Sequence, residues 1–175
     1  MPRPQPTDAA PFYHHYISLV NAGSAAEAVK NHSAEILAFY TSLPADKADF
    51  AYAGGKWTLR ELLLHVIDAE RVFSYRCMRI ARNDATPLPG FDENAYTANA
   101  QAANRSLESL KEEFTALRRA SDIFIATLSD DQLQHTGVAS NSPITANAIA
   151  FIMYGHLLHH MTVIEQRYLQ TNTNS

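Results

Sequence analysis

Hydrophobic positions recur at the three- and four-residue spacing of amphipathic helices in four long segments, 24–43, 58–82, 106–128 and 145–169. The third segment shows this most clearly, with apolar side chains at Leu107, Leu110, Phe114, Leu117, Phe124 and Leu128. No run of residues alternates between apolar and polar positions in the way that predicts a half-buried strand. Helices of this length bury their apolar stripes against one another, so the pattern predicts an all-α, up-and-down four-helix bundle.

The connections between these segments are rich in Pro, Gly, Asn and Asp. The second helix has a defined start, because Thr58 and Glu61 form the pattern of a capping box and Trp57 and Leu62 stand where a hydrophobic staple closes. A long loop, 83–104, separates the second and third helices and either makes a tight turn or crosses an end of the bundle. The Pro-rich first residues and the polar tail TNTNS are both expected to fray.

Length and composition predict a single globular domain, 1–175. Hydrophobic residues make up 46% of the chain and charged residues 18%, which excludes a disordered protein. The net charge of −4 gives no reason to expect nucleic acid or an anionic membrane as a partner. No stretch approaches the roughly 18 apolar residues of a membrane span, and the first residues lack the apolar run of a secretory signal.

Cys77 is the only cysteine of the chain. No intrachain disulfide can form, which favours a reducing cytoplasm as the location of the protein. The residue falls on the apolar stripe of the second predicted helix, so we expect its thiol to be inert packing and not a nucleophile.

The eight histidines are the main candidates for functional residues. His156 and His160 lie in the middle of the apolar stripe of the last predicted helix, one turn apart, which is close enough for two imidazoles to share one metal ion. Two core histidines that hydrogen-bond to their neighbours are the alternative. The zinc-protease pattern H-E-x-x-H is absent from the sequence.

A third imidazole is available on the second predicted helix. His65 lies at the edge of that helix's apolar stripe, and a facing helix can bring it to His156 and His160. Three neutral nitrogen donors with open positions for water or substrate are typical of a catalytic site, whereas structural zinc sites are closed by a fourth protein ligand. Zinc, nickel and copper all suit imidazole ligands, and of these zinc and nickel are expected. Taken alone, His65 is more simply explained as a histidine at the core boundary.

The sequence leaves the roles of other polar residues near these stripes undecided. Glu70 is the candidate catalytic carboxylate, since it can orient a ligand histidine or act as a base, but it can also form a structural ion pair with an arginine. Arg167 stands in line with the two histidines of the last helix and would need a partner if buried. His159 lies off the centre of the stripe and is expected to line the pocket. The remaining histidines, His14, His15, His32 and His135, are expected at the surface or in packing roles.

Three stretches of the chain resemble the DinB/YfiT-like superfamily: GKWTLRELLLHVIDAERVFSYRCMRIAR, TPLPGFDENAY and GHLLHHMTVIEQRYL. The resemblance covers nearly the whole chain and implies a four-helix bundle, commonly dimeric, with a three-histidine metal site. The matching positions here are His65, His156 and His160. Some members resemble S-transferases that use bacillithiol, mycothiol or glutathione, one is of a maleylpyruvate isomerase type, and many have no assigned reaction.

These observations give competing functional hypotheses. The first is a divalent-metal-dependent enzyme that transfers a low-molecular-weight thiol to a small-molecule substrate. The alternatives are a metal-dependent hydrolase, a non-enzymatic stress-response protein that binds a metal or a ligand, and a helical bundle without a metal.

A homodimer is expected from the last helix. The face opposite the histidines is also apolar, with Phe151, Tyr154, Leu158 and Met161. A helix that is apolar on both sides is buried on both sides, so this face predicts a contact with a second copy of the chain. The alternative is that the N-terminal segment PFYHHYISLV covers it.

Overall fold

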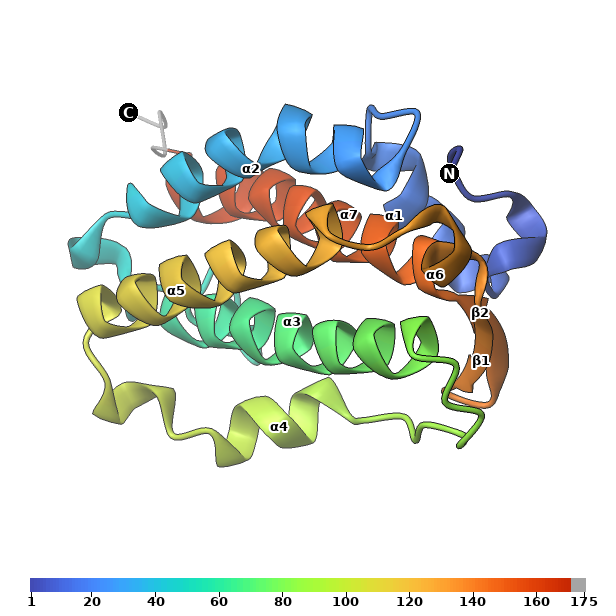
Figure 1. Ribbon diagram of the computed structural model, residues 1–175. Helices are drawn as coiled ribbons and strands as arrows, with labels where there is room; N and C mark the ends of the chain where they lie inside the picture. The colour runs from blue at the N-terminus through green and yellow to red at the C-terminus, as the bar shows by residue number, and fades with distance from the viewer. Residues whose placement is uncertain (171–175) are drawn as a thin grey trace.

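The computed structural model describes residues 1–170 of the chain, and its four long helices form a bundle (Figure 1). They are α2 (Ala25–Thr41), α3 (Leu59–Ala81), α5 (Leu107–Ala126) and α7 (Ala146–Ile164). All four were predicted from the hydrophobic pattern, so the all-α four-helix bundle is confirmed. None of the described helices is both long and apolar enough to cross a membrane.

Each long helix begins at a hydroxyl side chain that accepts a hydrogen bond from the third amide of the helix. These N-caps are Ser24, Thr58, Ser106 and Thr145. At Thr58 the reciprocal bond from the Glu61 side chain is also present, which confirms the predicted capping box. Such a cap stabilises a helix by about 1 kcal/mol, so the sequence fixes these helix starts locally.

The directions of the helices depart from a simple up-and-down order. Helices α3 and α5 run the same way, as Figure 1 shows, and the Glu70–Arg118 and Arg71–Glu113 ion pairs join them. The long segment between them contains α4 (Glu93–Asn99), which lies along α3 on the outside of the bundle. This crossing segment, 83–104, runs back along the side of the bundle to the start of α3 before α5 begins. It neither turns tightly nor crosses an end of the bundle, so both alternatives are wrong.

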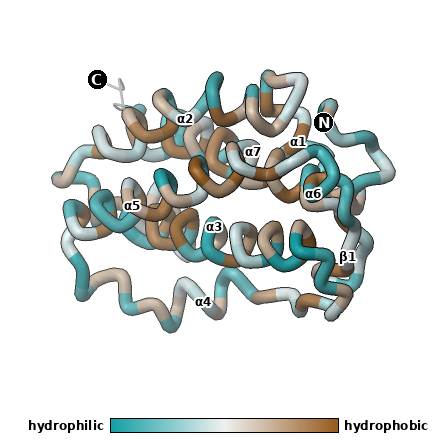
Figure 2. Tube along the Cα trace, in the orientation of Figure 1, coloured by the Kyte–Doolittle hydropathy of each residue, from teal (hydrophilic) through white to brown (hydrophobic). Residues whose placement is uncertain are grey.

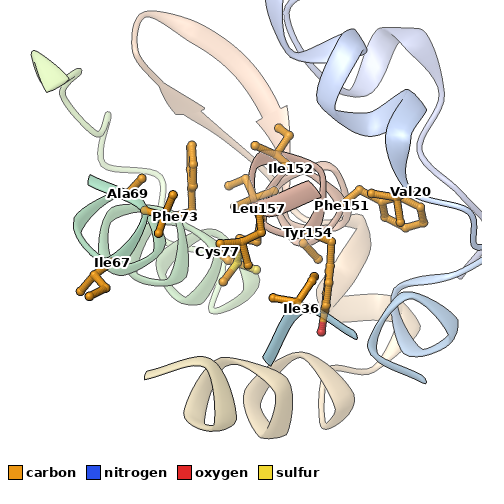
Figure 3. Close-up of a cluster of buried hydrophobic side chains, with 14 of the residues drawn as sticks. Val20, Ile36, Ile67, Ala69, Phe73, Cys77, Phe151, Ile152, Tyr154 and Leu157 are labelled. Atoms are coloured by element: carbon orange, nitrogen blue, oxygen red, sulfur yellow. The ribbon is translucent and has the colours of Figure 1, made fainter. Parts of the chain in front are cut away.

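Helix α7 lies against both α2 and α3, and its residues are apolar on nearly all sides (Figure 2). Figure 3 shows Phe73 and Cys77 of α3 on the side of that helix toward α7, near Leu157, within the buried core. Cys77 is buried, and burial raises the pKa of its thiol to about 12. The thiol is therefore un-ionised at neutral pH, in agreement with a packing role.

A β-hairpin precedes α7, where the sequence predicted no strand. Strands β1 (Thr136–Ala139) and β2 (Ser142–Thr145) pair antiparallel after the short helix α6 (Asp130–Gln134). The turn between the strands uses Ser140 and Asn141, both at positive φ. The expectation failed because four-residue strands are too short to show alternation, and Ser-Asn is a weaker hairpin signal than Asn-Gly.

The N-terminal segment is ordered, so the expectation that it frays is wrong. Its helix α1 (His14–Leu19) packs along α7, and the Arg3 guanidinium donates to the carbonyl oxygen of Val20. The amide of Asn147 donates to the carbonyl oxygen of Pro2 at 2.9 Å, which ties the first residues to α7. The tail TNTNS lies outside the described residues.

The N-terminal segment covers part of the second apolar face of α7, where Arg3 lies over the ring of Phe151. Tyr154 of the same face contacts His32 of α2 and Asp122 of α5 instead. Phe151 and Tyr154 are fully buried within the chain. Gly155 allows the closest approach, because the backbone of Tyr16 occupies the place of a β-carbon at this position. Contacts within the chain therefore bury most of this face, only partly through the N-terminal segment, and the homodimer stays a prediction without support from it.

Replacing Gly155 by alanine is expected to lower the free energy of unfolding by about 2 kcal/mol, the scale of an overpacked core. In an exposed helix the same change stabilises by about 1 kcal/mol, so a loss isolates the contact with Tyr16. Gly54→Ala is the control, since a methyl group there meets no atom within 4 Å. Urea unfolding of both variants measures the effect, and a stabilised Gly155→Ala protein would contradict the close packing of α1.

The position of Arg167 differs from the expected one because the helix changes its geometry after Ile164. Residues Glu165–Leu169 form a π-helical turn, which is wider than an α-helical one. The helix face therefore rotates after Ile164, so that Tyr168 is buried and Arg167 is exposed. The expectation that Arg167 stands in line with His156 and His160 assumed an uninterrupted α-helix and is wrong.

Candidate metal centre

His65 on α3 meets His156 and His160 on α7. The Nε2 atom of His156 lies 3.2 Å from Nε2 of His65 and 3.2 Å from Nε2 of His160. One nitrogen atom from each ring falls within 4.8 Å of the other two. The structure thus brings together the three histidines that the sequence selected.

The local fold explains this meeting. Helices α3 and α7 are neighbours, so one face of α3 turns toward the stripe of α7 that carries the two histidines. The indole of Trp57 lies against the His65 ring at 4.7 Å between centroids, and the Phe73 ring lies 5.6 Å from that of His156. Aromatic packing on both sides holds the imidazoles in place.

Burial keeps these imidazoles neutral. It lowers the pKa of His65 to about 4, although the nearby Glu93 carboxylate opposes the shift. Burial also lowers the pKa of His160 to about 3, and the neighbouring histidines add to that effect. The pKa of His156 is lowered well below its usual value for the same two reasons. Neutral rings offer the nitrogen lone pairs that a metal ion requires.

The three nitrogens fit a divalent metal ion. Two donors on a tetrahedral zinc lie about 3.3 Å apart when each zinc–nitrogen bond is about 2.0–2.1 Å, and the observed separations of 3.2 Å are close to that value. A single Nε2 on His156 cannot give favourable hydrogen bonds to two neutral rings at once. A cation at the point where the rings converge would satisfy all three. Within residues 1–170, these three histidines are the only group of three or more His, Cys, Asp or Glu side chains whose donor atoms lie close enough together to hold one metal ion.

A cavity of about 450 Å³ adjoins the histidines. His65, His156 and His160 all line it, so a ligand in the cavity has direct access to the nitrogen cluster. Most of the remaining wall is aromatic: Phe12, Tyr13, Tyr16, Trp57, Phe73 and Phe91. The site is therefore open on one side to a small and mostly apolar molecule.

Two charged residues of the cavity wall were missed by the sequence reasoning. Arg76 lies on the same face of α3 as His65, eleven residues later, and Glu93 begins α4. The helical periodicity of α3 could have identified Arg76, because an arginine on a buried stripe needs an explanation. Glu93 lies within the crossing segment, whose path the sequence did not give.

Glu70 does not line this cavity. Its carboxylate pairs with the Arg118 guanidinium of α5 at 2.7 Å, with both side chains buried. Arg118 also pairs with Asp122 at 2.8 Å. Glu70 is five residues after His65 and points to the side of α3 that faces α5. The structure therefore favours the structural ion pair over a role at the histidines.

The other histidines lie outside the cluster of three. His159 is next to it in sequence, but its Nδ1 lies 3.4 Å from Nε2 of the exposed His15. His159 lines a second, smaller cavity beside Tyr168 and is not part of the wall of the first, so its expected pocket-lining role is met only at the neighbouring cavity. His14 and His135 bond to backbone carbonyl oxygens, and His32 is packed in the interior.

The chain is similar to known proteins in sequence and in fold. Residues 28–164 match the model of the DinB superfamily. The structure is similar to that of YfiT from Bacillus subtilis, which is described as a probable metal-dependent hydrolase with an unusual four-helix bundle topology. The TM-score is 0.65 at 16% sequence identity, and the match covers 94% of this chain and 91% of that one. A comparison with curated protein sequences finds no match.

Proposed function

Since this chain belongs to the DinB superfamily, we propose that it is an enzyme that uses one divalent metal ion, zinc or nickel, held by His65, His156 and His160. Its substrate is a small molecule bound in the adjoining cavity. The observation that carries the proposal is the convergence of three neutral Nε2 atoms at the wall of an accessible cavity. A non-enzymatic binding protein is less well supported, because nothing among the described residues seals the cluster from the cavity.

The chain's own residues define the chemistry that this site supports. A bound divalent ion would lower the pKa of a thiol or a water molecule and so favour its nucleophilic form. Glu93 is the carboxylate of the cavity wall and is placed to accept the proton that the nucleophile loses. The aromatic walls at Tyr16, Trp57 and Phe73 exclude bulk water and hold an apolar substrate against the histidines.

The reaction that we favour is transfer of a low-molecular-weight thiol to an electrophile. The resemblance to thiol S-transferases within the superfamily supports it, and so does the apolar wall, which suits a hydrophobic electrophile and disfavours competing water. Cys77 cannot supply the thiol from within the chain, because it is buried and its pKa is raised to about 12. The thiol must therefore come from a second small molecule.

Hydrolysis is the second candidate. It is supported by the likeness to YfiT, described as a probable metal-dependent hydrolase, with which this chain shares the fold. The same three imidazoles and the same carboxylate, Glu93, would serve this reaction, with water in place of the thiol.

Turnover by metal-free and metal-loaded protein tests the proposal. A chlorodinitrobenzene-type electrophile is offered with a panel of thiols that includes bacillithiol, mycothiol and glutathione, and aryl esters are offered without a thiol. We expect thiol-dependent conjugation that requires zinc or nickel. Metal-dependent ester cleavage without conjugation would support the hydrolase instead. Equal rates with and without metal for every substrate would contradict both.

A further inference from the structure

Arg76 is a buried cation in the wall of the cavity. The residue is only 3% exposed, and its side chain extends from α3 toward residues of the crossing segment and the hairpin turn. One nitrogen, Nη2, donates to the carbonyl oxygen of Pro89 at 2.6 Å and to the hydroxyl of Ser140 at 3.1 Å. These two bonds hold the guanidinium in place, while its Nε and Nη1 atoms make no hydrogen bond to the residues that the structure describes.

No carboxylate neutralises this guanidinium within residues 1–170. Besides the two neutral hydrogen-bond acceptors, its charge faces the ring of Phe91, whose centroid lies 5.8 Å from the guanidinium carbon. The other buried arginine, Arg118, does have counter-charges, since it forms ion pairs with both Glu70 and Asp122. A buried charge without a counter-charge is costly, so the position of Arg76 calls for an anion from outside the chain.

The cavity is polarised along α3. His65 and Arg76 share one face of this helix and are about 16 Å apart along its axis at 1.5 Å per residue. Phe73 lies between them on the same face and points toward α7 (Figure 3). Glu93 belongs to the histidine end, because the next residue, Asn94, lines the second cavity together with Trp57 and His160, while Arg76 marks the other end. A ligand that carries one negative charge is therefore directed with that charge toward Arg76 and away from Glu93.

We propose that Arg76 is the anion-binding residue of this cavity, and that the cavity takes a small aromatic or apolar molecule bearing one carboxylate. The carboxylate accepts hydrogen bonds from the free donors of Arg76, the apolar body lies against Phe73 and Phe91, and the opposite end reaches the histidines. This assignment names the substrate class of the proposed enzyme and rests on that function for the reaction, although the binding step itself needs no metal.

Fluorescence of Trp57 reports on this binding. It is the only tryptophan of the chain and it lines the cavity. The probes are benzoate, 3-phenylpropionate and 4-phenylbutyrate, each compared with its neutral amide, titrated to millimolar concentration into protein treated with a chelator and into metal-loaded protein. The variants are Arg76→Gln, which removes the charge, Arg76→Lys, which keeps it, and Arg119→Gln, which removes a charge from the exposed face of α5.

We expect the wild-type protein to bind at least one of the carboxylates at least about tenfold more tightly than its amide, as a charge-assisted hydrogen bond implies. Arg76→Gln should abolish this preference, Arg76→Lys should keep part of it, and Arg119→Gln should keep all of it. Equal binding of every acid and its amide by the wild type, binding of none of the acids, or a preference that survives in Arg76→Gln would overturn the proposal. The first two of these outcomes are measured on the wild-type protein, so the proposal can be rejected even if an Arg76 variant folds poorly.

The metal-free arm separates this inference from the proposed function. A carboxylate preference in chelator-treated protein that also shows no metal-dependent turnover would uphold the Arg76 site and reject the enzyme. Metal-dependent turnover without any carboxylate preference would uphold the enzyme and reject the Arg76 site.

Discussion

Replacing His160 by alanine is expected to lower the affinity for zinc or nickel by more than about 100-fold. Substitutions in the outer shell of a metal site cost about 10–100-fold, and His160 supplies one of only three nitrogen donors in the cluster. The same loss is expected for His65→Ala, whose ring reaches the cluster from the other helix. Titration of each variant with nickel, followed by quenching of the adjacent Trp57, measures the affinity.

A histidine near the cluster but outside it provides the control. His15 is exposed and touches His159, and its nitrogen is not part of the group of three. His15→Ala should therefore bind metal as the wild type does. Unchanged affinity in both His65→Ala and His160→Ala would mean that the ion sits elsewhere, and an equal loss in all three variants would point to an indirect effect.

Replacing Glu70 by alanine is expected to lower the free energy of unfolding by about 3–5 kcal/mol, because it leaves the buried guanidinium of Arg118 with one partner instead of two. For a chain of this length such a loss lowers the melting temperature by roughly 10 °C. Glu112→Ala, at an exposed position of α5, should change the stability little. Thermal unfolding of the two variants gives the comparison.

The same variant decides between the two interpretations of Glu70. If its carboxylate serves only the ion pair, metal content and the affinity of the cavity for ligands should be unchanged at temperatures where Glu70→Ala is folded. A stable Glu70→Ala protein that has lost turnover would restore the catalytic interpretation and assign the role of Glu93 differently.

The sequence predicted those parts of the structure that depend on local physics. Helix starts follow from hydroxyl caps such as Thr58, and the four long helices follow from the spacing of their apolar side chains. His65, His156 and His160 could be selected because each is a polar ring on or beside an apolar stripe, and two of them are one turn apart. The superfamily was also identified from the sequence, and its family model confirms it.

The features that were missed depend on long-range packing. The path of the 83–104 segment is set by its contacts with α3, such as the hydrogen bond from the Arg76 guanidinium to the carbonyl oxygen of Pro89. That path puts α5 parallel to α3, so neither the shared direction nor the arrival of Glu93 in the cavity follows from periodicity. The covering of α7 by α1 depends on the approach of Tyr16 to Gly155, which sequence spacing does not reveal.

The anomalous signal of a crystal grown with zinc or nickel, recorded on both sides of the absorption edge of the metal, tests the central claim most directly. One peak is predicted at about 2.0–2.1 Å from the Nε2 atoms of His65, His156 and His160, with an open side toward the aromatic cavity. The absence of a peak at these three nitrogens, or a peak bound by only one of them, would contradict the account.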